Sequence, residues 1–197
     1  MQSMKNVTRD TKKIRGRPTV LDRDAAVEVA EQLFHEIGYD QLGVSAICDA
    51  VGVRQPALYR VFGSKAGIFK AALERYLNTS FATFLGHEIV AAKTVTELRS
   101  RILLRATQVY TSDSSRKGCM ALETAVYCTD ETTRRLAAAQ VRKTHQAIAS
   151  QAIELGCKNP AGFADGLLLV LQGLSSASRM GKTGAELQTA VEVILEL

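Results

Sequence analysis

The segment from Val44 to Lys65 most narrowly limits what this chain can fold into, because it reads as two short helices joined by a tight turn. Its first half places apolar residues on one face of a helix, namely Ala46, Ile47, Ala50 and Val51. Gly52 can take the positive φ that ends a helix. Pro56 suits the first turn of a new helix, where its missing N–H has no intrahelical partner to lose. The segment therefore predicts a helix-turn-helix.

The second of these two helices is expected to present polar side chains to solvent. Leu58 and Phe62 are four residues apart and give the helix one buried side. The opposite side carries hydrogen-bond donors and a methyl group, and its residues are Arg54, Gln55, Ala57, Tyr59 and Arg60. Groups of this kind suit the edges of bases in a DNA groove. The pattern therefore indicates a DNA-binding function.

The segment from Leu33 to about Ala72 resembles the DNA-binding domain of the tetracycline-repressor (TetR) family of bacterial transcriptional regulators. The resemblance rests on the patterns Leu-Phe-x-x-x-Gly-Tyr, Ile-x-x-x-x-Gly-Val and Leu-Tyr-x-x-Phe-Gly-Ser-Lys-x-x-Ile-Phe. The rest of the chain agrees with the family in length and helix count. Gly43 and Arg54 replace the residues that usually cap the second and third helices, and Val61 replaces a frequent histidine.

The resemblance implies roles for residues of the helix-turn-helix. Tyr59 and Lys65 match phosphate anchors, and Lys65 begins the fourth helix, where free backbone N–H groups also attract phosphate. Arg54, Gln55 and Arg60 match base-edge readers or further phosphate contacts. For Arg54, a solvated turn residue is an alternative. The expected DNA-binding residues are Arg15, Arg17, Ser45, Arg54, Gln55, Ala57, Tyr59, Arg60 and Lys65.

The segment that precedes the first helix is strongly basic. Residues 1–17 hold six lysines and arginines against the single acid Asp10, and the whole chain has a formal net charge of +5. Such a run is either a solvated tail or an arm that enters the minor groove of DNA. Because a helix-turn-helix follows, we expect Arg15 and Arg17 to belong to a DNA-binding arm.

Helix signals continue to the end of the chain, so the sequence predicts an all-α protein of about nine helices. The expected caps and stops are Asp22, Gly38, Ser64, Thr94, Gly156, Asn159 and Thr183. The apolar stripe of the first helix is Ala26, Val29, Ala30, Leu33, Phe34 and Ile37. We expect a basic arm with a three-helix helix-turn-helix DNA-binding domain over residues 1–69. A helical ligand-binding and dimerisation domain follows over residues 70–197, and the fourth helix links the two.

The last two predicted helices carry a large apolar surface. Leu167 to Leu171 is a run of five apolar residues, so that helix needs cover on more than one side. The expected dimer-interface residues are Leu167, Leu171, Leu174, Leu187, Val191 and Ile194. The alternative is a single compact bundle that buries both helices internally. A homodimer places two heads in successive major grooves of a palindromic operator.

The resemblance also implies a pocket for a small-molecule inducer that lowers operator affinity by favouring one of two conformations. The candidate lining residues are Phe81, Phe84, Tyr110, Met120, Glu123, Thr124, Tyr127, His145 and Gln172. Each has a plainer explanation, because an aromatic residue or methionine on an apolar stripe usually packs in a core. For His145, a buried imidazole is the alternative. The mixture of side chains favours an amphipathic organic ligand.

The motifs of other functional classes are missing from the sequence. It holds no phosphate-binding loop, no nucleophile elbow and no His-Glu-x-x-His zinc motif. Cys48, Cys119, Cys128 and Cys157 form no Cys-x-x-Cys pair, and burial is favoured over a sensor thiol at Cys119 or Cys128. The first residues lack the apolar core of a signal peptide, and no run of about 18 apolar residues occurs, so we expect neither a signal peptide nor a membrane span.

We therefore expect a cytoplasmic, homodimeric DNA-binding repressor that is released by a small organic inducer. We expect neither an enzyme nor a protein that needs a metal or cofactor, and no association with a membrane. The alternative is a dimeric helical protein-interaction module that does not bind DNA.

Overall fold

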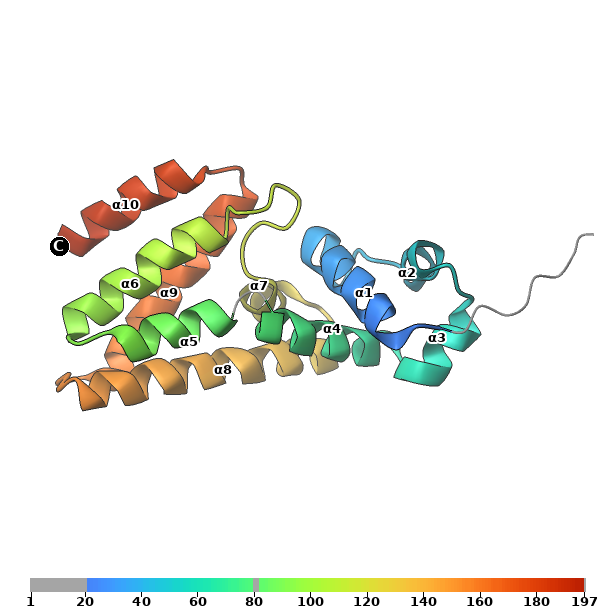
Figure 1. Cartoon of the computed structure of the whole chain (residues 1–197), viewed down its shortest axis with the longest axis horizontal. Coiled ribbons are helices and arrows are strands. Elements are labelled where there is room, and N and C mark those ends of the chain that lie inside the picture. The colour runs from blue at the N-terminus through green and yellow to red at the C-terminus, as the bar shows by residue number, and fades with distance from the viewer. Residues whose placement is uncertain (1–20, 80–81, 197) are drawn as a thin grey trace, which may run out of the picture.

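The computed structural model describes residues 21–79 and 82–196. This part of the chain holds ten helices and no strand (Figure 1). The helices are α1 Arg23–Ile37, α2 Val44–Val51, α3 Gln55–Phe62, α4 Lys65–Thr79, α5 Ala82–Ala91, α6 Val95–Val109, α7 Met120–Tyr127, α8 Glu131–Glu154, α9 Pro160–Arg179 and α10 Gly184–Glu196. The all-α prediction is confirmed. Helix α5 is not among the predicted helices.

Helices α1, α2 and α3 form a small head around the start of α4. Phe34, Ile47, Leu58 and Phe69 fill its core, and none of the four is more than 2% exposed. The rings of Phe34 and Phe69 meet edge to face, with 5.2 Å between their centroids. Burial of one such side chain contributes about 1.5–3 kcal/mol. These residues form the head's part of a hydrophobic core that continues into the C-terminal half.

The predicted helix ends are confirmed where their geometry is described. The Asp22 carboxylate accepts hydrogen bonds from two backbone N–H groups of the first turn of α1, at 3.0 and 3.1 Å. Gly52 ends α2 with a φ of 74°. Thr183 and Glu186 form the reciprocal capping box, because each side chain accepts from the other residue's backbone N–H, at 3.3 and 2.9 Å.

Helix α4 joins the head to the C-terminal half of the molecule. It packs against α1 and α3 in the head and against α5 and α8 beyond it. The long helix α8 runs from α4 to the far end of the molecule and also packs on α7 and α9 (Figure 1). Helix α6 lies among α5, α9 and α10.

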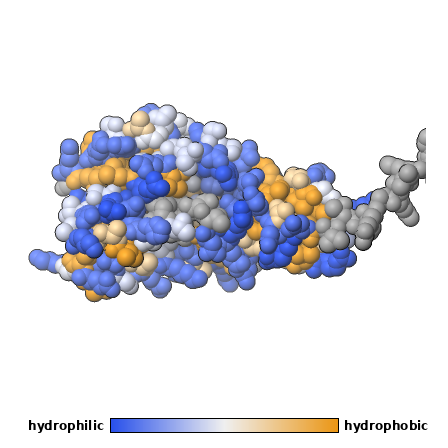
Figure 2. Space-filling view, in the orientation of Figure 1, coloured by the Kyte–Doolittle hydropathy of each residue, from blue (hydrophilic) through white to orange (hydrophobic). Residues whose placement is uncertain are grey.

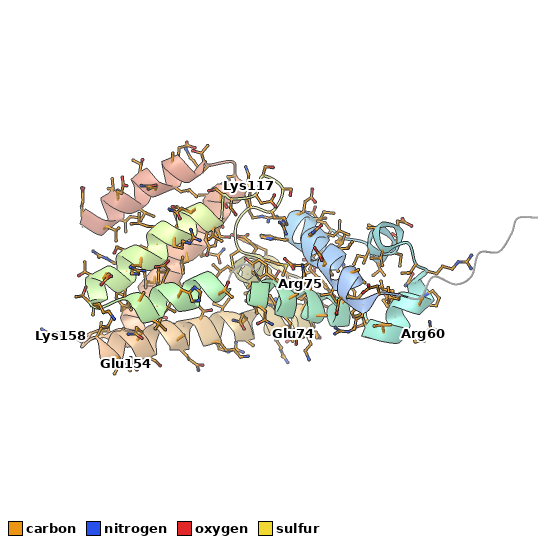
Figure 3. All side chains as sticks on the ribbon, viewed as in Figure 1. Arg60, Glu74, Arg75, Lys117, Glu154 and Lys158 are labelled. Atoms are coloured by element: carbon orange, nitrogen blue, oxygen red, sulfur yellow. The ribbon has the colours of Figure 1, made fainter. Side chains whose placement is uncertain are left out.

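The buried face of α1 differs from its predicted apolar stripe. Ile37 is 37% exposed, whereas Glu31 and His35 are only 3% and 7% exposed. Glu31 is buried because it pairs with the guanidinium groups of Arg75 on α4, at 3.0 Å, and Arg116 before α7, at 4.0 Å. Figure 3 labels Arg75 on the part of α4 beside α1. Polar contacts thus fix this face of the head.

The predicted dimer-interface residues lie mostly in the core of the single chain. The five buried residues are Leu167, Leu171, Leu174, Leu187 and Val191, with exposed fractions of 0–5%. They are covered because α9 packs on α6, α7 and α8, and α10 packs on α6. Ile194 is half-buried. The assignment of the five buried residues to an intermolecular contact was therefore wrong.

Hydrophobic residues nevertheless reach the surface over both the head and the C-terminal half (Figure 2). Among the described residues, no helix is long and apolar enough to cross a bilayer. Within residues 21–79 and 82–196, no group of three or more His, Cys, Asp or Glu side chains is arranged to hold a metal ion.

Candidate nucleic-acid interface

The turn between α2 and α3 depends on the backbone conformation of Gly52. Its N–H donates to the Asp49 carbonyl at 3.3 Å, and the Val53 N–H donates to the Cys48 carbonyl at 3.0 Å. A side chain at position 52 would meet nothing within 4 Å. The positive φ, rather than a lack of space, therefore requires glycine here. The turn directs α3 away from α2 and exposes its outer face.

Both helices of this motif begin without a side-chain cap. Gly43, which has no side chain, precedes α2, and Arg54, whose guanidinium group cannot accept a hydrogen bond, precedes α3. The first N–H groups of a helix have no intrahelical partner, and the helix dipole gives this end a partial positive charge. The start of α2 therefore offers backbone donors to an anion such as phosphate. The start of α3 offers fewer, because Pro56 has no N–H and the Ala57 N–H donates to the Arg54 carbonyl at 2.9 Å.

The predicted contact residues of α2 and α3 lie on the outer part of the head. The exposed members are Ser45, Arg54, Gln55 and Arg60, and the half-buried members are Ala57 and Tyr59. Arg60 lies at the end of the molecule opposite the C-terminal half (Figure 3). Leu58, on the inner side of α3, is fully buried. Helix α3 thus presents a polar outer face, whereas Arg15 and Arg17 lie outside the described residues.

Lys65 has a second role that its sequence position does not reveal. Its Nζ donates to the Tyr39 carbonyl at 2.6 Å and lies 4.3 Å from the centroid of the Tyr39 ring. The ammonium group therefore ties the loop after α1 to the start of α4. The backbone N–H of Lys65 still belongs to the first turn of α4, so its role as a phosphate anchor stays a prediction.

Gly67 is a structural requirement of this surface that the sequence did not single out. A Cβ at position 67 would lie 1.9 Å from the carbonyl oxygen of Phe62. The first turn of α4, capped by the Ser64 hydroxyl at 3.1 Å from the Gly67 N–H, thus packs directly on the end of α3. A glycine three residues after a capping serine was the available signal. Gly67 sets how closely α3 and α4 approach.

Four predicted inducer-binding residues line a cleft between the head and the C-terminal half. The cleft has a volume of about 240 Å³, and these residues are Met120, Glu123, Thr124 and Tyr127. All four residues lie on α7, and the side of α7 that carries them faces the end of α1 and the loop that follows it.

The other candidates are not brought to this cleft. Tyr110 is fully buried in the core, and Gln172 lines a separate surface hollow beside α7 and α9. His145 is half-buried, and its Nε2 lies 3.0 Å from the Asp165 carboxylate. The side chains of Phe81 and Phe84 lie outside those that the structure describes. The structure thus brings Met120, Glu123, Thr124 and Tyr127 together and not the other described candidates, and the inducer site stays a prediction.

The cysteines are free thiols, and three of them are buried. Burial raises the pKa of the Cys119 thiol to about 11, and it also raises the pKa of Cys128. A thiol with a raised pKa is a poor nucleophile. This agrees with the favoured interpretation of these two cysteines as small hydrophobic residues.

The chain is similar to known proteins along most of its length. Residues 26–72 match a family model described as bacterial regulatory proteins, tetR family. The chain is 29% identical to the HTH-type transcriptional repressor BdcR of Escherichia coli (strain K12) over 197 residues, which cover 96% of this chain and 99% of that protein. It is 28% identical to the HTH-type transcriptional repressor ComR of the same strain over 199 residues, which cover 96% of this chain and 95% of that protein.

A solved structure shares both the fold and the arrangement of the two halves. It is a cysteine mutant of the TetR family transcriptional regulator CifR, complexed with 26-bp double-strand operator DNA. The TM-score is 0.82 at 26% identity, and the match covers 91% of this chain and 98% of that chain.

Proposed function

We propose that this chain, which belongs to the TetR family of bacterial transcriptional regulators, represses transcription by holding operator DNA against α2, α3 and the start of α4. The observation that carries the proposal is the polar outer face of α3, with Gln55 and Arg60 exposed, beside the uncapped start of α2 at Gly43. The operator DNA in the CifR complex and the repressor names of BdcR and ComR support it.

The proposed contacts divide between phosphates and bases. Free N–H groups of the first turn of α2, with Tyr59 and Lys65, bind phosphate oxygens and fix the orientation of the head. Gln55 and Arg60 lie on the outer face of α3 and read base edges in the major groove. A bidentate arginine-to-guanine contact contributes about 1–3 kcal/mol of discrimination.

The proposed DNA-binding unit contains two copies of the chain. The solvent-facing side of α9 carries the small and apolar residues Gly166, Leu169 and Gly173 at helical spacing, and Met180 follows directly at its C-terminal cap. Leu169 and Met180 are 75% and 81% exposed, and Val193 on α10 is 56% exposed. Glycines allow two helices to approach closely, so these faces suit a symmetric four-helix contact. Such a homodimer would read a palindromic operator.

We further propose that a small organic molecule releases the repressor from DNA. We place the start of the C-terminal ligand-binding domain near residue 70. The ligand binds this domain and changes the position of the heads. The effect requires different ligand affinities for the two conformations.

The DNA-binding proposal is tested with a duplex that the protein itself selects from a random-sequence pool. Affinity is measured by fluorescence anisotropy across a salt titration. Six or more phosphate contacts predict a loss on the order of a thousandfold between about 50 and 200 mM salt. A flat response would favour the interaction-module alternative.

Substitutions separate the two kinds of contact. Lys65→Ala is expected to weaken binding to all duplexes about equally. Arg60→Ala is expected to weaken the selected duplex more than a scrambled one, because base contacts carry the sequence discrimination. Lys158→Ala, at the opposite end of the molecule (Figure 3), is the matched control.

A further inference from the structure

The cleft between the head and the C-terminal half is walled by both parts of the molecule. Its residues include Ile37, Tyr39 and Asp40 from the head side and Met120, Glu123 and Tyr127 from α7. Its volume is about 240 Å³. A cavity of about 150 Å³ accepts a benzene molecule. The cleft therefore has room for one ring with a short polar chain.

Hydrogen bonds between the head and the C-terminal half lie around this cleft. The His35 ring Nε2 donates to the Gly118 carbonyl at 3.1 Å, and Arg179 donates to the His35 carbonyl at 3.1 Å. The Asp40 carboxylate accepts from the backbone N–H of Thr129 at 2.8 Å and from its hydroxyl at 3.0 Å. His35, Asp40 and Arg179 themselves line the cleft. A molecule bound there lies among the contacts that position the head.

The head side of the cleft is directly connected to the proposed DNA surface. Tyr39 forms part of the wall, and its carbonyl and ring both contact the Lys65 ammonium group. Lys65 is the first residue of α4. Any displacement of Tyr39 and Asp40 therefore acts on the start of α4, which is one of the proposed phosphate contacts.

The charges in the cleft favour a hydrogen-bond donor that carries a positive charge. One oxygen of Glu123 accepts from the Ser175 hydroxyl at 2.6 Å, whereas its Oε2 has no hydrogen-bond donor among the described residues. Hydrogen bonds from Thr129 hold the pKa of the Asp40 carboxyl below its ordinary value, so this group is ionised. The one guanidinium, Arg179, already donates to backbone carbonyls.

The remaining groups of the wall agree with this preference. Burial lowers the pKa of His35 to about 4, so its imidazole is neutral near pH 7. Tyr127 is 63% exposed and offers an aromatic face beside Glu123. Ammonium groups bind to carboxylates through charge-assisted hydrogen bonds and to aromatic faces through cation–π attraction.

We propose that this cleft is an effector site for a small amphipathic amine, whose ammonium group donates to Oε2 of Glu123 and whose apolar body lies against Met120 and Tyr127. Occupancy shifts the head and weakens DNA binding. The DNA part of this inference rests on the proposed function.

The probe is phenethylamine, with phenylacetate as the anionic counterpart of similar size. Binding is measured by calorimetry, and affinity for the selected duplex is measured by anisotropy. Millimolar phenethylamine is expected to bind and to lower DNA affinity roughly 5- to 150-fold, the usual range of coupling between two sites. Phenylacetate is expected to do neither.

Variants locate the site. Glu123→Gln preserves the side-chain shape and an oxygen for Ser175 but removes the charge, so amine binding is expected to fall at least about tenfold, as for a lost charge-assisted hydrogen bond. Tyr127→Ala, at an exposed position, is expected to weaken amine binding without disturbing the fold. Glu192→Gln, an exposed carboxylate on α10, is the matched control.

The outcomes distinguish this inference from the proposed function. Failure of phenethylamine to bind, equal binding of phenylacetate, or unchanged binding to Glu123→Gln overturns the amine site. If the protein binds amine but no duplex DNA, the proposed function fails and the site remains. If it binds DNA and amine independently, the coupling is refuted.

Discussion

Acidification is expected to destabilise the fold through His35. The imidazole is 7% exposed, and its edge contacts the Tyr76 ring at 5.2 Å between centroids. Burial, with smaller contributions from the guanidinium groups of Arg179 and Arg116, lowers its pKa from 6.5 to about 4. Its hydrogen bond to the Gly118 carbonyl opposes this shift but does not cancel it.

The sign of the effect follows from proton binding by the two states. Above pH 6.5 the histidine is neutral in both the folded and the unfolded chain, so it adds no pH dependence. Between pH 6.5 and about 4 the unfolded chain binds a proton that the folded chain does not, so the free energy of unfolding falls as the pH falls. The full difference between these two pKa values corresponds to about 3 kcal/mol.

Urea denaturation at pH 7.5 and pH 5 measures this loss. The His35 contribution to the free energy of unfolding is expected to fall by about 2 kcal/mol between these two values. His35→Gln keeps an N–H donor for the Gly118 carbonyl but does not titrate. The free energy of unfolding of this variant should therefore fall by about 2 kcal/mol less than that of the wild type between pH 7.5 and pH 5. His87→Gln, at an exposed position on α5, should behave like the wild type. Equal losses in wild type and His35→Gln would refute the reasoning.

Three further substitutions test packing, capping and assembly. Gly67→Ala forces a Cβ against the end of α3 and should lower the free energy of unfolding, measured by urea denaturation, by about 1–3 kcal/mol. The control Gly86→Ala, whose Cβ meets nothing within 4 Å, should raise it by about 0.5–1 kcal/mol. Equal effects of the two substitutions would contradict the close approach of α3 and α4. Asp22→Ala should cost about 1 kcal/mol by the same measurement, and no loss would mean that the cap contributes nothing. Leu169→Glu should give monomers in sedimentation while Val90→Glu, equally exposed on α5, does not; a monomeric wild type would exclude the dimer.

The helix-turn-helix was predictable because its signals are local. Gly52 ends α2 through its own φ, and Asp22 caps α1 through bonds to the next few residues. Leu58 is buried as its spacing indicates. Each of these features depends on a short window of sequence, so no knowledge of distant contacts was needed.

The contact between the head and the C-terminal half was not predictable in the same way. Glu31 and His35 look like solvent-facing residues of α1, but distant residues supply their partners. Arg75 and Arg116 pair with Glu31, and the Gly118 carbonyl accepts from His35. The sequence shows Leu171 only as part of an apolar run that needs cover. Its actual cover comes from the packing of α9 on α6, α7 and α8, which the run itself does not reveal.

The missing caps of α2 and α3 affect the free protein as well as the complex. A helix start without a side-chain acceptor is less stable than a capped one, by a few tenths of a kcal/mol for a glycine such as Gly43 and by about 1 kcal/mol for other residues, so these first turns open more readily. Their amide protons should exchange rapidly with solvent in the absence of DNA and slowly in the complex, where phosphate oxygens take the place of the cap. Gly43→Ser would therefore slow exchange in the free protein and weaken DNA binding, because the new hydroxyl would compete with phosphate for the same N–H groups.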